Sequence, residues 1–277
     1  MKKIIWIASY PKSGNTWLRS ILSSLFYTED GIFNFKLLKN IPYFENKKNY
    51  EFVKNISKID YNNLNNISVI SKYRIQSQKK IKIRDGNFVF LKTHAANLLV
   101  NNYEYTNKET TIGLIYVVRD PRDVVISLTN HYGSSSEEMT NYILNERNCY
   151  ISGYPHILSS WNHHYNSWYY LDVPKIIIKY EDMLKNIENI IDKLINFFDK
   201  NFNHKIINVE TKVKNILIST NFNNLQNEEK KIGFPEAKNS RFFNVGKSKQ
   251  WQNKLNKNQI FRIEKTFKKN MQDLNYL

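Results

Sequence analysis

The sequence has a single cysteine, Cys149, in 277 residues. One cysteine excludes an internal disulfide and predicts a protein of a reducing compartment. Long hydrophobic runs are also missing, because a Lys-Lys pair at positions 2–3 precedes only the short apolar stretch Ile4 to Ala8, which is broken at Pro11. This stretch is too short for a signal peptide or a membrane span, so we expect a cytoplasmic protein without a membrane span.

Charge is unbalanced but not clustered. Lys and Arg number 41 against 25 Asp and Glu, a formal net charge of +16, yet no run of five or more basic residues occurs. This excess is compatible with nucleic acid, a membrane surface or a polyanionic small molecule as partner. Because abundant Asn, Ile, Lys and Tyr indicate a compositional bias, the charge permits these functions without selecting one.

The content of 41% hydrophobic and 14% aromatic residues predicts a folded globule. Short apolar runs alternate with helical patterns, which favours an α/β fold with a P-loop-like, doubly wound, mainly parallel sheet flanked by helices. Without an internal repeat or linker, residues 1–277 are predicted to form one domain. The expected strands are 3–8, 88–92, 114–118 and 175–179, and the expected helices are 16–26, 121–130, 136–147, 156–170, 187–198, 206–219 and 257–271.

Two segments resist this pattern. Residues 31–86 are rich in Asn and Lys with interleaved aromatics, and residues 221–250 are polar and turn-rich. Long connections in compact domains often serve as lids or pocket walls, and we expect both segments to do so.

The stretch Tyr10-Pro11-Lys12-Ser13-Gly14-Asn15-Thr16-Trp17 joins the first expected strand to the first expected helix. Such a turn directs backbone N–H groups and a helix N-terminus at one spot, where a phosphate or sulfate can bind. Gly14 lets the backbone come close, Thr16 adds a hydroxyl donor and Lys12 adds a charge. The Walker pattern, with two glycines ahead of its lysine, is not matched. Taken alone, the stretch could also be an ordinary turn with a solvated lysine.

Two further motifs follow expected strands. In Lys92-Thr93-His94 the first and third side chains share a face, and a histidine near neutrality can accept a proton from an attacking hydroxyl or amine. In the stretch from Arg119 to Ser127, the arginine fork and the serine two turns later can meet at one anion. Alone, His94 could be satisfied by a local hydrogen bond, and the charged residues at 119–123 could form a surface ion network.

Together these motifs resemble the sulfotransferases that use 3'-phosphoadenylyl sulfate (PAPS). Y-P-K-S-G-N-T-W is similar to their 5'-phosphosulfate loop, K-T-H to the segment of their catalytic base, and R-D-P-R-D-V-V-I-S to their 3'-phosphate signature. Tyr180-Glu181-Asp182 and Ser219-Thr220-Asn221-Phe222 resemble segments that line the adenine site. The last signature is degraded: Gly246 and Trp251 align, but Asn244 and Val245 replace an expected Arg-Lys pair, and Arg241, Lys247 or Lys249 is the candidate substitute.

The resemblance implies that PAPS is the sulfuryl donor, that PAP is the product and that no metal is needed. It implies a cofactor site made of Lys12, Ser13, Gly14, Asn15, Thr16, Trp17, Arg119, Ser127, Tyr180, Thr220, Phe222, Arg241, Gly246 and Lys247. His94 would be the general base, Lys12 would stabilise the leaving nucleotide, and Lys92 would help to hold the transferring group. The acceptor would be the hydroxyl or amine of a small molecule.

Two alternatives remain. A P-loop-like kinase would use ATP and Mg²⁺, and a basic nucleic-acid-binding protein would show steep salt dependence. The missing Walker lysine counts against the first alternative, and the lack of a recognition motif counts against the second. The sequence does not predict the oligomeric state, and a homo-oligomer is one of the possibilities.

Overall fold

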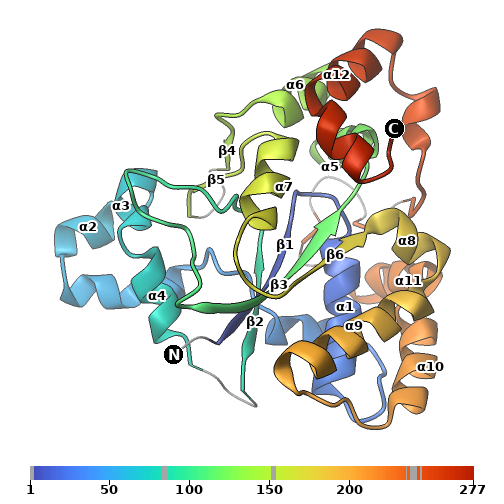
Figure 1. Ribbon diagram of the computed structural model, residues 1–277, viewed down its shortest axis with the longest axis horizontal. Helices are drawn as coiled ribbons and strands as arrows, with labels where there is room; N and C mark the ends of the chain where they lie inside the picture. The colour runs from blue at the N-terminus through green and yellow to red at the C-terminus, as the bar shows by residue number, and fades with distance from the viewer. Residues whose placement is uncertain (1–2, 83–86, 151–153, 235, 238–241, 244) are drawn as a thin grey trace. The chain divides into compact units, whose positions relative to one another are not determined.

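The computed structural model describes residues 3–82, 87–150, 154–234, 236–237, 242–243 and 245–277 (Figure 1). Strands β1 (Ile4–Ser9), β2 (Val89–Thr93), β3 (Thr111–Val118) and β6 (Lys175–Lys179) form a sheet in the order β2-β1-β3-β6. β1 and β2 are parallel, from Ile4 opposite Val89 to Ala8 opposite Thr93. The four predicted strands are confirmed with small shifts at their ends, as is the α/β class with a mostly parallel sheet.

Helices connect these strands. They are α1 (Asn15–Tyr27), α2 (Lys58–Asn62), α3 (Ile67–Ser71), α4 (Arg74–Lys80), α5 (Pro121–Tyr132), α6 (Ser136–Leu144), α7 (Trp161–Tyr169), α8 (Tyr180–Lys185), α9 (Ile187–Phe202), α10 (Val209–Ser219), α11 (Phe222–Ile232) and α12 (Lys257–Asp273). The short 3₁₀ helices are η1 (Phe35–Asn40), η2 (Lys47–Asn55) and η3 (Gln250–Asn253), and a hairpin is formed by β4 (Cys149–Tyr150) and β5 (His156–Ile157).

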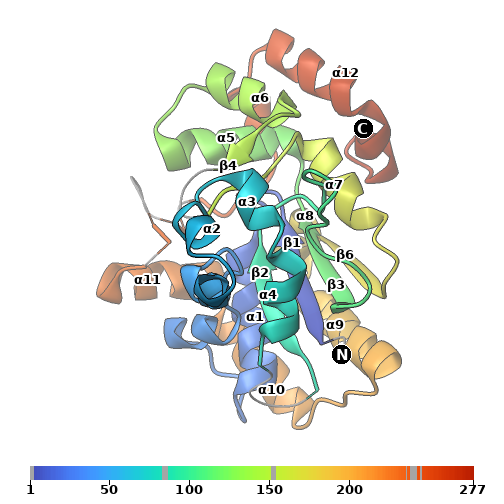
Figure 2. The same ribbon diagram turned by 90° about the vertical axis from the view of Figure 1, so that its left-hand side faces the viewer.

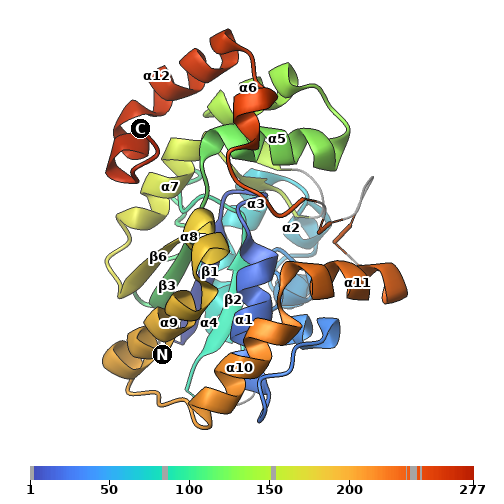
Figure 3. The same cartoon turned by 90° about the vertical axis from the view of Figure 1, so that its right-hand side faces the viewer.

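The chain interleaves two compact units. Unit 1 comprises 1–10, 42–116 and 143–175, and unit 2 comprises 11–41, 117–142 and 176–277. In unit 1, α4 and α2 contact η2 (Figure 2). In unit 2, α1 lies beside α10, which also contacts α11 (Figure 3). The division runs through β3, and a single domain over 1–277 stays a prediction.

The Asn-rich segment 31–86 contains more helix than its sequence indicated. The side chains of Asn34, Asn46 and Asn66 each accept the backbone N–H two residues later and so begin η1, η2 and α3. Asparagine is among the preferred residues at this helix position. The same role recurs at Asn186, Asn221 and Asn256, which cap α9, α11 and α12.

The prediction of a helix over 156–170 was wrong at its start. His156 and Ile157 belong to β5, and α7 begins only at Trp161. Between them Ser159 has a φ of 63°, a left-handed conformation that interrupts a right-handed helix. Ser160, in an extended conformation, then becomes the residue before the helix.

Candidate active site

The site residues fall in both units, and unit 2 holds most of them. There α1 begins behind Gly14, whose φ is 100° and which offers no side-chain cap. The first N–H groups of a helix have no partner inside the helix, so an uncapped N-terminus can bind an anion. Ser13 Oγ is buried and has no hydrogen-bond partner among the described residues. These donors fit a phosphate or sulfate group.

Lys12 lies just before this helix start, also left-handed with a φ of 66°. Its Nζ is 3.4 Å from Nδ1 of His131 and 4.3 Å from the ring centre of Phe242. Neither neighbour is among the residues that the sequence predicted for the site. His131 could have been found, because it lies four residues after Ser127 on the same helix face. Phe242 gives no comparable signal, since it is distant in sequence.

Arg119 joins the Lys12 segment to the C-terminal region of unit 2. Its Nη1 donates to the carbonyl of Lys12 (3.1 Å) and its Nη2 to the carbonyl of Lys247 (3.0 Å). The guanidinium carbon also lies 4.3 Å from the ring centre of Tyr180. Arg119 is buried, and its Nε lacks a partner within the part of the chain that is described. Ser127 is half-buried two turns into α5.

Trp17 contacts two of the other predicted adenine-site residues, Tyr180 and Thr220. Its ring stands edge-on to that of Tyr180 at 6.1 Å, and a Cβ at Gly14 would lie 2.6 Å from the Tyr180 ring. Trp17 Nε1 also donates to the carbonyl of Thr220 at 2.9 Å. Burial raises the pKa of the Tyr180 phenol, and the Arg119 charge partly offsets that rise.

The degraded last signature is built around Phe222. Gly246 has a φ of 61°, and a Cβ there would lie 2.6 Å from the Phe222 ring, so only glycine lets the chain pass so closely. Phe222 also contacts Phe243. Arg241 and Asn244 lie outside the described residues. The Lys247 side chain is exposed, whereas its carbonyl holds Arg119.

Thr16 has an unexpected partner. Its Oγ1 donates to Glu236 Oε2 (3.0 Å), and Glu236 Oε1 accepts from the buried Arg19 at 2.7 Å. A carboxylate therefore engages a hydroxyl that was predicted to bind phosphate. Asn15, next to it, is buried at the first position of α1.

Unit 1 contributes the Lys92-Thr93-His94 segment at the end of β2. Lys92 is buried, and its backbone N–H and carbonyl bond to Pro42 O (2.9 Å) and Phe44 N (3.0 Å). This pairing places the ring of Tyr43 5.6 Å from Lys92 Nζ. Tyr43 lies 6.2 Å from the ring of His94 and so gives the segment an aromatic neighbour.

The tautomer of His94 follows from its partners. Its Nδ1 is 2.9 Å from the carbonyl oxygen of Ser9 and 3.3 Å from Ser9 Oγ. A carbonyl oxygen can only accept, so the proton sits on Nδ1 and the basic lone pair on Nε2. A half-buried imidazole with this arrangement can act as a general base when it is in its neutral form.

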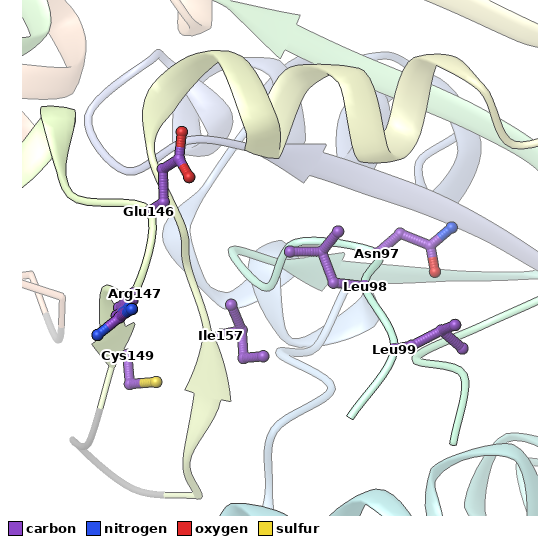
Figure 4. A pocket seen from close by; sticks show the side chains of 7 residues that line it. All are labelled: Asn97, Leu98, Leu99, Glu146, Arg147, Cys149 and Ile157. Atoms are coloured by element: carbon purple, nitrogen blue, oxygen red, sulfur yellow. The ribbon is translucent and has the colours of Figure 1, made fainter. Parts of the chain in front are cut away.

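Unit 1 also contains a pocket of about 660 Å³, and its first lining residue along the chain, Asn97, follows His94 by three residues. Figure 4 shows Asn97, Leu98 and Leu99 on one side and residues of the β4–β5 hairpin and its approach on the other. Its lining is Asn97, Leu98, Leu99, Glu146, Arg147, Cys149 and Ile157. Apolar walls with a few charged groups suit a small organic molecule.

Two features are absent from the described residues. No group of three or more His, Cys, Asp or Glu side chains there could hold a metal ion. Within the same residues, no helix has the length and apolar character that crossing a membrane requires.

Two relatives of this chain are sulfotransferases. The chain is 27% identical over 236 residues to luciferin sulfotransferase of Photinus pyralis, covering 80% of this chain and 56% of that protein. It is 23% identical over 280 residues to amine sulfotransferase of Oryctolagus cuniculus, covering 97% and 81%. The chain thus spans little more than half of the first relative.

Solved structures show the same fold. Retinol dehydratase in complex with androsterone and inactive cofactor PAP superposes with a TM-score of 0.63 at 19% identity, covering 98% of this chain and 81% of that one. A mouse sulfotransferase complexed with PAP gives a TM-score of 0.56 at 17% identity, with 98% and 84% coverage. The sulfotransferase domain family matches residues 2–275, and the chain therefore belongs to that family.

Proposed function

We propose that this protein transfers a sulfuryl group from PAPS to a hydroxyl or amine of a small-molecule acceptor. The observation that carries the proposal is the start of α1, which has no side-chain cap and which left-handed Lys12, the buried Ser13 Oγ and left-handed Gly14 precede. Family membership and the two relatives named as sulfotransferases support it.

Unit 2 would hold the donor nucleotide. The helix start, Ser13 and Asn15 would bind its 5'-phosphate, with Thr16 once released from Glu236. Arg119 and Ser127, with Arg241, Gly246 and Lys247, would hold its 3'-phosphate. The aromatic side chains of Trp17, Tyr180 and Phe222, with Thr220, would line the purine, because bases stack well on aromatic faces. When bound, PAPS supplies the sulfuryl group.

Unit 1 would act on the acceptor. Nε2 of His94 would take the proton of the attacking hydroxyl or amine, while Nδ1–H keeps its bond to Ser9. Lys92 would stabilise the transferring group, and Lys12 would balance negative charge on the departing nucleotide, as lysines do in phosphoryl transfer. The pocket beyond His94, with Tyr43, would receive the acceptor.

The decisive experiment measures stability against unfolding with PAP in metal-free buffer, and separately with ATP and Mg²⁺. At 100 times its Kd a ligand adds about 2.7 kcal/mol. We expect stabilisation by PAP alone. Stabilisation by ATP with Mg²⁺ alone would instead identify a kinase. Single-stranded DNA is the control for general binding of polyanions.

The role of Ser127 can be tested with a matched ligand pair. Ser127→Ala should weaken PAP by about 5-fold, the value of one hydrogen bond of about 1 kcal/mol. The affinity for 5'-AMP, which lacks the 3'-phosphate, should not change. Equal losses for both nucleotides would remove Ser127 from the 3'-phosphate site.

A further inference from the structure

One face of α7 contacts the segment that carries His94. His164, Ser167 and Trp168 are spaced i, i+3 and i+4 and therefore share a helix face. Three hydrogen bonds join them to residues 94–97: His164 Nε2 to His94 O (3.1 Å), Trp168 Nε1 to Ala95 O (2.8 Å) and Asn97 N to Ser167 Oγ (2.9 Å). The backbone from His94 onward is thus held at residues 94, 95 and 97.

His164 is the member of this face that acts on His94 itself. It is fully buried, and because the carbonyl of His94 can only accept, its Nε2 carries the proton. Its Nδ1 then accepts from the hydroxyl of Tyr116 at 2.8 Å, which fixes this tautomer. Burial lowers the pKa of His164 to about 3, so the ring stays neutral near pH 7. A neutral ring, which has one N–H donor and one acceptor nitrogen, can keep both bonds throughout the working range of an enzyme.

Residues outside α7 also hold this segment. Thr93 Oγ1 donates to the buried carboxylate of Glu45 (3.1 Å) and lies 2.6 Å from the hydroxyl of Tyr105. The N–H of Ala96 donates to Ile157 O at 2.8 Å. At His94, the imidazole contacts Ser9 and the backbone carbonyl accepts from a side chain of α7. The α7 contact therefore acts on the same residue that carries the imidazole.

We propose that His164 is a positioning residue for His94: by donating Nε2–H to the His94 carbonyl, it orients the imidazole for proton transfer. The inference rests on the proposed function, in which His94 is the base. His164 touches neither acceptor nor nucleotide in this scheme, so its loss should lower kcat and leave binding intact. Displacing a catalytic group by about 1 Å costs up to about 100-fold in rate.

The test compares two substitutions of similar size. His164→Phe keeps the bulk of the ring but has no hydrogen-bonding atoms. His164→Gln restores a donor and an acceptor on one planar group. Sulfuryl transfer is measured with radiolabelled PAPS and with 4-nitrophenol and aniline as acceptors, and PAP binding is measured by calorimetry.

We expect His164→Phe to lower kcat by about 10-fold to 100-fold, with the Kd of PAP and the acceptor KM within about 2-fold of wild type. His164→Gln should recover most of that loss. Wild-type kcat in folded His164→Phe would overturn the proposal, and so would a Gln variant as slow as the Phe variant.

Two further results bear on the proposal. If His164→Phe does not fold, His164→Leu replaces it, because leucine also lacks hydrogen-bonding atoms; an unchanged kcat in that folded variant overturns the proposal. Transfer that is retained at the wild-type rate by a folded His94→Ala variant would refute His94 as base, and the positioning role with it.

Discussion

Replacing Gly14 by alanine tests the geometry of the anion site directly. A Cβ there would lie 2.6 Å from Cδ2 of Tyr180, well inside contact distance, and the φ of 100° is unfavourable for any L-residue. The left-handed conformation costs about 1–2 kcal/mol. Overpacking adds about 1–3 kcal/mol. Together they predict that Gly14→Ala lowers the free energy of unfolding by about 2–5 kcal/mol.

Gly133 provides the matched control in the same unit. It ends α5 with a φ of 68°, yet a Cβ there would meet nothing within 4 Å. Gly133→Ala therefore carries the backbone cost of about 1–2 kcal/mol alone. The gain from restricting the unfolded chain is common to both variants and cancels. Their difference in urea unfolding isolates the contact with Tyr180.

Ligand binding separates the two variants further. A displaced Tyr180 would disturb the rings of Trp17 and the guanidinium of Arg119 that lie against it. We expect PAP to bind Gly14→Ala at least 10-fold more weakly, a loss of about 1.4 kcal/mol, and Gly133→Ala normally. Equal stability in the two variants together with unchanged PAP affinity would refute the reasoning.

Three other predictions concern single groups. Glu236→Gln should tighten PAP binding by about 5-fold in calorimetry, because a carboxylate beside Thr16 repels phosphate by about 1 kcal/mol; weaker binding would show that Glu236 supports the loop instead. His164 has a pKa of about 3 when folded against 6.5 ordinarily, so below pH 6.5 only the unfolded chain takes up its proton, and stability is lost as pH falls toward 3. Between pH 6.5 and 5 the wild type should lose up to about 1.4 kcal/mol per pH unit more than His164→Gln in urea titrations, and parallel slopes would contradict the buried neutral ring. Lys12→Ala and His94→Ala should each lower kcat at least ~100-fold while His94→Ala still binds PAP, and retained turnover in either would cancel its assigned role.

Local patterns were enough to predict the strands and the start of the anion site. Each strand is a short, mainly apolar run, and Gly14 has a positive φ that favours glycine. The start of α7 was mispredicted because the helical pattern of 156–170 gives no sign that Ser159 adopts a left-handed backbone. Helix propensity is an average over many proteins, and a single residue with a left-handed backbone is enough to prevent a helix that the propensity predicts.

The neighbours of the site could not be predicted for a different reason. Glu236 lies 220 residues from Thr16, and Phe242 is as distant from Lys12, so only the folded chain brings each pair together. The hydrogen bond from His164 to a backbone carbonyl also could not be predicted from the sequence, because any residue at position 94 supplies that carbonyl. Side-chain types indicate chemistry, whereas these contacts depend on the register of whole elements.

The asparagines that cap η1, η2, α3, α9, α11 and α12 are positions where the net charge of this basic protein can be lowered by substitution. Aspartate accepts the same backbone N–H groups and adds a favourable interaction with the helix dipole. Changing Asn34, Asn46, Asn66, Asn186, Asn221 and Asn256 to aspartate would bring the formal net charge from +16 to +10, since six negative charges are added. The surface could therefore be made less cationic, and less adhesive toward nucleic acid, at positions where the fold already presents an oxygen acceptor.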